Sequence, residues 1–277
     1  MSYQGTLGYQ GGKSHVAGWI TEQCPPAEFF VDVFGGSGSV ALAAVRCQKF
    51  SQVIYNDADR EIFDTLICIR DRCEELIEFL EQTPLGKEGN QTIYTLKNSK
   101  DDLERAAGCV MQLARTIFTP TLHNNEYNRT TVPSIRSKGS IGGGYKTWAG
   151  KLGRLKAMQR DLLKVFFENR HWETIVNCYT LTSKATVSQG PVTKIFFLDP
   201  PYGKTQDYKM TADIVKVVDY FKKNDDYTIK MLCGEEGAHH LKHYEYIPFP
   251  YGKNNNKKEY KHGIYIHDRC LRGKRLL

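Results

Sequence analysis

The sequence predicts an α/β fold with a doubly wound, mostly parallel sheet and an inserted, mainly helical subdomain. Three short apolar runs, rich in aromatic and β-branched residues, are typical of buried strands: residues 28–34, 52–55 and 194–198. Segments with helical spacing or good helix formers follow each of them. Strands that alternate with helices form parallel sheets covered on both faces. With 277 residues, 40% hydrophobic and 12% aromatic, the chain can bury a core of this kind.

The elements follow one another in a regular order. The first strand ends in Gly-Gly-Ser-Gly, and good helix formers occupy residues 40–47 before the second strand. Apolar residues at helical spacing then predict a helix within 62–80. The strand at 194–198 runs into Asp-Pro-Pro-Tyr, and we expect a helix over 212–221 and a strand over 227–232.

Between the two halves lies a segment of different character. Residues 100–118 have helical periodicity, 119–150 are rich in Thr, Asn, Ser, Gly and basic residues, and 152–167 return to a helical pattern. A loop of this length inside a compact sheet domain is usually functional or disordered. The sequence therefore predicts an inserted subdomain.

The charge is unevenly distributed, although the net value is only +7. Residues 60–104 hold 6 Lys and Arg against 11 Asp and Glu, whereas residues 105–164 hold 11 against 2 and residues 251–277 hold 8 against 2. Clustered Lys and Arg favour a polyanion because binding releases counterions. A solvated basic face is an equally good interpretation of charge alone.

Several classes of protein are excluded or disfavoured. No apolar run approaches the roughly 18 residues of a membrane-spanning helix, and residues 1–13 lack the pattern of a secretory signal, so we expect a cytoplasmic protein. The eight cysteines include no C-x-x-C pair, which favours neither a zinc site nor a disulfide framework. We expect no metal.

The run from Asp32 to Ser39 predicts a cofactor site. Glycines after a buried strand let the backbone approach a ligand, and the N-terminus of the next helix favours a negative group. Gly36, Gly38 and Ala41 fit the dinucleotide fingerprint, and Asp57 or Asp59, about 20 positions on, could take the ribose hydroxyls. A nicotinamide dinucleotide and S-adenosylmethionine both present a ribose to such a carboxylate, so this motif leaves the cofactor open.

Residues 8–14 resemble a phosphate-binding P-loop, but Leu7 stands where that motif needs Gly and no strand precedes it. A lysine after two glycines, Lys13, can instead reach a carboxylate or a ligand, and Tyr9 offers a stacking face.

Asp199-Pro200-Pro201-Tyr202 follows a buried strand, at the edge where open α/β sheets place their ligands. Two prolines fix the backbone, so the Asp199 carboxylate and the Pro200 carbonyl point in set directions. Accepting both hydrogens of an exocyclic amine such as adenine N6 aims the nitrogen lone pair at an electrophilic methyl group. Tyr202 supplies a face on which the base can stack.

Taken together, Tyr9-x-Gly-Gly-Lys13, Asp32-x-Phe-Gly-Gly-Ser-Gly38, Tyr55-Asn-Asp57 and Asp199-Pro-Pro-Tyr202 resemble, in this order, the Dam-like alpha-group DNA adenine-N6 methyltransferases. The resemblance implies a Rossmann-like catalytic domain that binds S-adenosylmethionine, made of residues 1–69 and 166–277, and a target-recognition subdomain at 70–165. It implies methylation of adenine N6 in double-stranded DNA at a specific site, with the base flipped out of the helix.

The resemblance also assigns roles to residues. The cofactor residues would be Tyr9, Lys13, Asp32, Phe34, Gly35, Gly36, Ser37, Gly38, Asp57 and Asp199, and the catalytic residues would be Asp199, Pro200, Pro201 and Tyr202. The basic and polar residues expected to contact DNA are Arg115, Asn124, Arg129, Arg136, Lys138, Tyr145, Lys146, Lys253, Lys257 and Lys258.

Other functions stay open at this point. N4-methylation of cytosine poses the same geometric problem, and RNA could replace DNA as the substrate. A catalytically idle DNA-binding module and a dinucleotide-dependent oxidoreductase are the remaining alternatives, the last leaving Asp199 to Tyr202 unexplained. We expect a monomer or a weak dimer.

Overall fold

The structure is a computed structural model that describes Leu7 and residues 12–83, 89–115, 145–181, 194–201, 212–223, 228–235, 241–250 and 262–268. Within these ranges the side chains of residues 89–90, 114–115, 145–151, 181 and 268 are not described.

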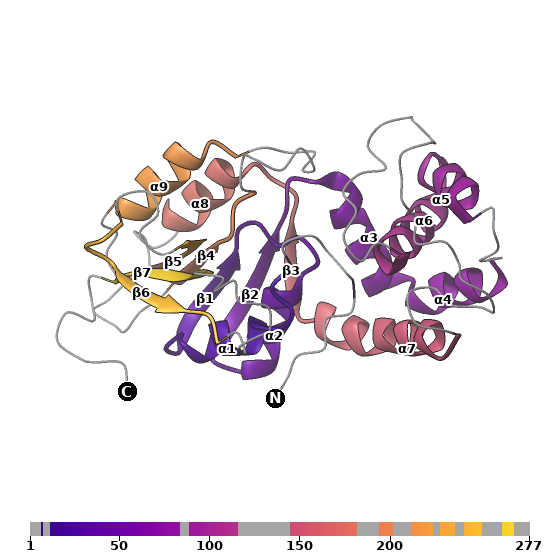
Figure 1. The fold of residues 1–277 in the computed structure, drawn as a ribbon, viewed down its shortest axis with the longest axis horizontal. Coiled ribbons are helices and arrows are strands. Elements are labelled where there is room, and N and C mark those ends of the chain that lie inside the picture. The colour runs from indigo at the N-terminus through magenta and orange to yellow at the C-terminus, as the bar shows by residue number, and fades with distance from the viewer. Residues whose placement is uncertain are drawn as a thin grey trace, which may run out of the picture.

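A seven-stranded sheet forms the centre of the molecule (Figure 1). Its strands are β1 (Ala27–Asp32), β2 (Phe50–Asn56), β3 (Val165–Glu168), β4 (Lys194–Leu198), β5 (Thr228–Glu235), β6 (Glu245–Pro248) and β7 (His262–Asp268). The order is β3-β2-β1-β4-β5-β7-β6. The first five strands are parallel, and β7 joins β5 and β6 in antiparallel pairs. The prediction of a mostly parallel, doubly wound sheet is confirmed.

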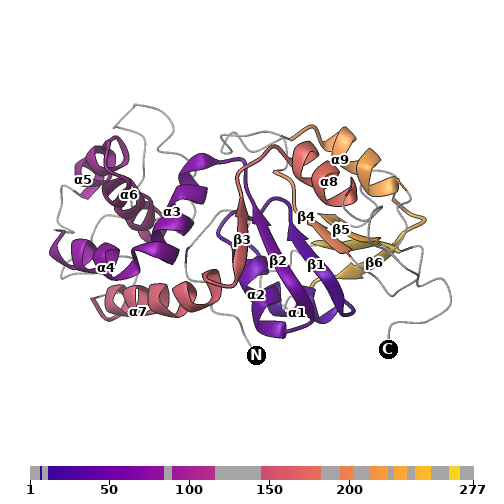
Figure 2. The ribbon, with the colours of Figure 1, turned by 180° about the vertical axis from the view of Figure 1, so that it is seen from behind.

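Helices cover both faces of the sheet and build a lobe beside it. The helices are α1 (Ala17–Glu22), α2 (Ser39–Cys47), α3 (Arg60–Asp71), α4 (Cys73–Gln82), α5 (Gly89–Lys97), α6 (Asp102–Arg115), α7 (Tyr145–Leu162), α8 (Trp172–Leu181) and α9 (Ile214–Lys222). Figures 1 and 2 show α3 to α7 gathered into one helical lobe on the β3 side of the sheet.

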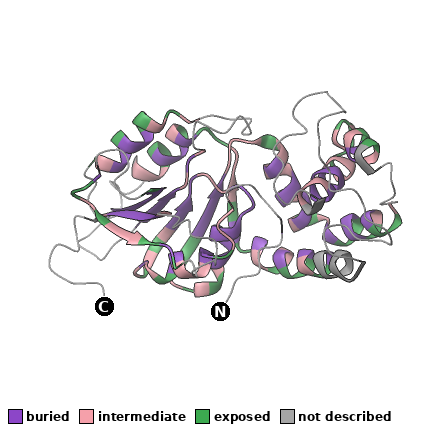
Figure 3. Ribbon diagram, viewed as in Figure 1, coloured by how far each residue is buried: buried purple, intermediate pink, exposed green. Residues whose placement is uncertain are grey.

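The apolar core divides between the two faces because successive strand residues point to opposite sides. Phe30 and Phe197 pack with α1 and α2 on one face, whereas Val31 and Phe196 pack with α8 and α9 on the other. The first cluster continues without a break into the helical lobe, where it includes Leu80, Ala107 and Met158. The buried residues of Figure 3 accordingly run from the strands into the lobe.

Several boundaries differ from the sequence prediction. The helical pattern at 62–80 is divided at Arg72 into α3 and α4, and the pattern at 152–167 is helical only to Leu162. Residues 165–168 instead form the edge strand β3, on which Phe166 is 55% exposed. A run this short cannot be distinguished from a helical segment by its periodicity. Helices α1, α5 and α8 and strands β6 and β7 were not predicted.

The helical lobe is held by close packing and buried polar contacts. A Cβ on Gly108 of α6 would lie 2.9 Å from the backbone nitrogen of Lys97, so α5 and α6 approach closely there. The Lys97 ammonium lies 2.5 Å from the Glu61 carboxylate of α3 and donates to Gln112 of α6. Lys97 thus links three helices.

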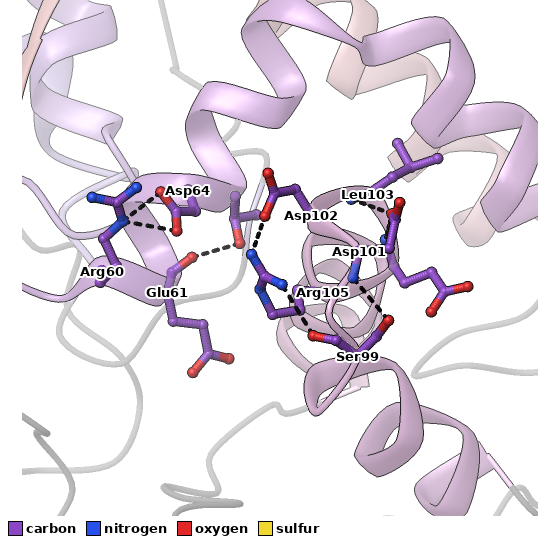
Figure 4. Close-up of polar contacts among 10 residues, drawn as sticks. Arg60, Glu61, Asp64, Ser99, Asp101, Asp102, Leu103 and Arg105 are labelled. Atoms are coloured by element: carbon purple, nitrogen blue, oxygen red, sulfur yellow. Dashed lines mark hydrogen bonds and ion pairs between the residues drawn. The ribbon is translucent and has the colours of Figure 1, made fainter.

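The beginning of α6 is capped by a side chain, as Figure 4 shows. The Asp101 carboxylate accepts the N–H groups of Leu103 at 2.8 Å and Glu104 at 3.0 Å, a standard N-cap arrangement. None of the helices in the described ranges combines the length and the apolar character that crossing a membrane requires.

Candidate active site

Three acidic side chains lie at the carboxyl edge of the sheet. β1 ends at Asp32, while Asp57 and Asp199 directly follow β2 and β4. β1 lies between β2 and β4, and the helices that follow β1 and β4 cover opposite faces of the sheet. This is the topological switch point, where open α/β sheets bind their ligands.

A glycine turn leads from β1 into α2. Gly36 and Gly38 have φ angles of 49° and 73°, in the left-handed region that favours glycine. The Gly38 N–H donates to the Gly35 carbonyl at 2.9 Å, and α2 begins at the next residue. The predicted strand, turn and helix are confirmed, and the turn places the N-terminus of α2 at the carboxyl edge.

Asp57 holds this turn from the neighbouring strand. One of its carboxylate oxygens accepts the Gly36 N–H at 2.7 Å, and the other accepts the Asp59 N–H at 2.8 Å. Burial raises the pKa of Asp57 to about 6, although both hydrogen bonds favour the ionised form. This carboxylate, one of the two that the sequence offers to a ribose, is therefore also part of the scaffold of the turn.

Asp32 is almost completely buried, with 1% of its surface exposed. One carboxyl oxygen accepts the Ala41 N–H of α2 at 3.1 Å, whereas the other has no hydrogen-bond partner among the described residues. Burial, with the nearby Asp199 charge, raises the pKa of Asp32 to about 8. A buried carboxyl with an unsatisfied oxygen is suited to a cationic ligand.

Lys13 and Asp199 form an ion pair with 2.5 Å between the ammonium nitrogen and a carboxylate oxygen. Both side chains are largely buried, although 186 positions separate them in sequence. Lys13 thus reaches a carboxylate, one of the two kinds of partner that the sequence predicts for it. Burial and the Asp199 charge raise the pKa of the Cys233 thiol well above its usual value, so a neutral thiol lies beside the pair.

The remaining predicted residues that the structure describes lie close by. Phe34 is partly buried and packs near Trp172, with 6.4 Å between the ring centroids. The Ser37 hydroxyl is buried and shares a hydrogen bond with Ser39 at 2.8 Å. Pro200 is buried and Pro201 is partly buried, directly after β4.

Other predicted site residues lie outside the described residues: Tyr9, Tyr202, Asn124, Arg129, Arg136, Lys138, Lys253, Lys257 and Lys258. Arg115 lies in α6, and Tyr145 and Lys146 lie in α7, at positions whose side chains are not described.

Sequence reasoning missed a polar connection among the strand ends. The Asn56 amide donates to the carbonyls of Val33 at 2.9 Å and Arg170 at 3.1 Å, and its oxygen accepts the Arg170 N–H at 3.0 Å. Asn169 donates to the Asp57 carbonyl at 2.7 Å. The available signal was an asparagine at the end of a buried strand, since such a buried amide needs partners.

The described residues contain no group of three or more His, Cys, Asp or Glu side chains arranged to hold a metal ion. The charged groups at this edge are three carboxyls and a lysine, which lie beside a glycine turn at a helix N-terminus.

Comparison with known proteins gives a family. The model of the D12 class N6 adenine-specific DNA methyltransferases matches residues 9–227. No curated protein matches the chain. Among solved structures, the rRNA methyltransferase AviRa from Streptomyces viridochromogenes matches with 11% sequence identity and a TM-score of 0.37, over 91% of this chain and 82% of that one.

The family match covers most of the chain and includes the glycine turn, Asp57 and the Asp199-Pro200 strand end. The chain therefore belongs to the D12 class N6 adenine-specific DNA methyltransferases, enzymes that methylate adenine in DNA with S-adenosylmethionine as the methyl donor.

Proposed function

We propose that this enzyme is of the Dam-like alpha group and that the switch-point edge of its sheet is the site of methyl transfer to adenine N6. The observation that carries the proposal is the convergence of Asp32, Asp57 and Asp199 around the glycine turn. The order of the four sequence motifs supports the alpha-group assignment.

The charges at this edge fit S-adenosylmethionine, which carries a sulfonium and an ammonium group. The Asp57 carboxylate supplies negative charge within a largely buried region, and Asp32 can add to it when a bound cation lowers its pKa. We assign the ribose hydroxyls to Asp57 and the methionine part to the turn from Phe34 to Gly38, with Tyr9 and Lys13 as further contacts. When bound, the cofactor supplies an electrophilic methyl group.

Asp199 and the Pro200 carbonyl act on the substrate. An exocyclic amine has two hydrogens, and we propose that these two acceptors bind one each, so that the nitrogen lone pair turns toward the methyl donor. An ionised carboxylate can accept about four hydrogen bonds, so Asp199 can hold Lys13 and the amine together. The acceleration comes from positioning and fixed charge. Pro201 fixes the backbone, and Tyr202 stacks on the base.

We further propose that the substrate is double-stranded DNA and that the adenine is flipped out of the duplex. N6 lies inside the stacked helix, and flipping costs a few kcal/mol, which stacking and phosphate contacts offset. The basic residues of the insertion and of the C-terminal segment, among them Arg129, Arg136 and Lys253, supply the phosphate contacts. We assign target recognition to residues 70–165 and expect a monomer or weak dimer.

Replacing Asp199 tests the site. Asp199→Ala should lower kcat for adenine methylation by at least about 100-fold, the usual scale for losing a group that stabilises the transition state. The loss of S-adenosylmethionine affinity, measured by calorimetry, should be much smaller. Unchanged turnover would contradict the proposal.

A matched control is available. The Asp161 carboxylate also lies 2.5 Å from a basic side chain, that of Arg46, but on α7 rather than at the switch point. Asp161→Ala should therefore leave kcat unchanged.

A further inference from the structure

Tyr55 contacts the glycine turn in two ways, although none of the motif roles assigned above involves it. It lies near the end of β2 and is 1% exposed. Its hydroxyl donates to the Gly36 carbonyl at 2.8 Å. Because Gly36 has a φ of 49°, the turn has little intrinsic preference for this conformation, and the hydrogen bond fixes the direction of the Gly36–Ser37 peptide.

The ring of Tyr55 occupies the space beside Gly35. A Cβ on Gly35 would lie 2.2 Å from the ring, closer than atoms can approach. The Gly35 N–H donates to the Asn56 carbonyl at 2.8 Å, so the first residue of the turn is held by β2 through both ring and backbone. The Tyr55 ring therefore restricts the conformations that the glycine turn can adopt.

Aromatic packing keeps the Tyr55 ring in place. Its centroid lies 5.2 Å from that of Phe167 on β3. Phe167 in turn contacts α3, with the Phe63 ring 6.1 Å away and the Arg70 guanidinium 5.1 Å from its centroid. Since the ring is enclosed by β3 and α3, it cannot turn away from the glycines without disturbing this packing.

We propose that Tyr55 is a positioning residue for the methyl donor: its hydroxyl and ring hold the Gly35–Gly38 turn in the conformation that binds S-adenosylmethionine. This inference rests on the proposed site at the switch point. It assigns Tyr55 no contact with the reacting atoms. Without the hydroxyl, the turn occupies its binding conformation for a smaller fraction of the time, and the apparent affinity falls by that fraction.

Tyr55→Phe tests the inference because it removes the hydroxyl and keeps the ring. The dissociation constant for S-adenosylmethionine, measured by calorimetry, should rise about fivefold, the usual effect of one hydrogen bond. The KM for S-adenosylmethionine should rise similarly, while kcat at saturation and the KM for DNA stay within about twofold of the wild-type values.

Tyr265→Phe is the matched control. Tyr265 is also 1% exposed, and its hydroxyl also donates to a backbone carbonyl, that of Glu235 at 2.7 Å. Both variants should lose similar thermal stability, but only Tyr55→Phe should weaken cofactor binding. An affinity within twofold of wild type in Tyr55→Phe, or an equal loss in Tyr265→Phe, would overturn the inference.

Gly36→Ala separates this inference from the proposed site. Alanine is strained at a positive φ, so this change distorts the turn itself. If Gly36→Ala leaves the cofactor affinity unchanged, the cofactor does not bind at this turn and the proposed site is wrong. If Gly36→Ala weakens binding and Tyr55→Phe does not, the site stands and the role of Tyr55 is refuted.

Discussion

Asp32 shows how burial changes the chemistry of a residue that the sequence identifies only as acidic. It is enclosed at the end of β1, with one hydrogen bond from Ala41 and one oxygen without a partner among the described residues. Its pKa of about 8 means that most of this carboxyl is protonated at pH 7, even with the Lys13 charge nearby. The sequence predicted the residue, but its protonation depends on Asp199 and on the packing around it.

This burial predicts how stability varies with pH. Asp32 and Asp57 have native pKa values raised to about 8 and about 6 from the ordinary 3.8, so between pH 4 and 8 the native state keeps protons that the unfolded state loses. The stability that these two groups contribute to the folded protein is therefore fully present below about pH 4 and is lost as the pH rises through 6 and 8.

The Asp32→Asn variant measures how much of this pH dependence of stability comes from Asp32. The free energy of unfolding of the protein without cofactor, measured in urea at pH 5, 6.5 and 8, should fall less steeply in this variant. One proton accounts for at most about 1.4 kcal/mol per pH unit. Equal slopes in the two proteins would show that Asp32 ionises normally.

At the scale of elements, three buried or partly buried lysines cap the carboxyl ends of helices. Lys49 donates to three carbonyls at the end of α1, Lys194 donates to Tyr179 in the last turn of α8, and Lys230 donates to Tyr220 and Lys223 at the end of α9. A positive group at a helix C-terminus satisfies orphan carbonyls and the helix dipole. Because these carbonyls pair with their ammonium groups, Lys194 and Lys230 can be buried within strands.

Lys230→Met should lower the free energy of unfolding by about 1–3 kcal/mol in urea denaturation. The change keeps the volume but leaves the carbonyls of Tyr220 and Lys223 without this donor, and part of that cost is offset because a buried ammonium disappears. Lys216→Met removes an exposed lysine of α9, the helix that Lys230 caps, and should change the value by less than about 0.5 kcal/mol. Equal effects would refute the capping role.

The elements themselves divide into those that periodicity reveals and those that it does not. Strands β1, β2, β4 and β5 and helices α2, α6 and α9 were predictable because their apolar runs are buried and bounded by turn residues. The edge strand β3 was not, because it is four residues long and partly exposed. The break between α3 and α4 depends on Arg72, which carries no helix-ending signal of the Gly or Pro kind.

At the scale of the whole molecule, acidic and basic residues concentrate on different helices of the lobe, although these helices are in contact. Helix α4 exposes Glu74, Glu75, Glu78 and Glu81, which repel phosphates, whereas in the sequence the basic residues are concentrated before and within α7. The Lys156 ammonium of α7 lies 3.4 Å from the Glu74 carboxylate. We therefore expect DNA to approach the lobe away from α4.

Arg129→Ala and Arg136→Ala should weaken DNA binding by an amount that depends on salt. Each phosphate contact contributes about 0.9 to the slope of log K against log salt concentration, so the slope should fall by about that value in each variant. Fluorescence anisotropy with duplex DNA at 50 to 200 mM salt measures it. Lys216→Ala, on α9, should keep the wild-type slope, and an unchanged slope in the arginine variants would contradict their assignment.

Local patterns were enough to predict the α/β class, the glycine turn and the acidic residues that end three strands, because glycine, proline and apolar spacing restrict the backbone over a few neighbouring positions. The Lys13–Asp199 pair, the protonation of Asp32 and the enclosure of Gly35 by Tyr55 could be known only from the folded chain. Each depends on segments far apart in sequence, whose distance and exclusion of water arise only when the sheet and its helices assemble.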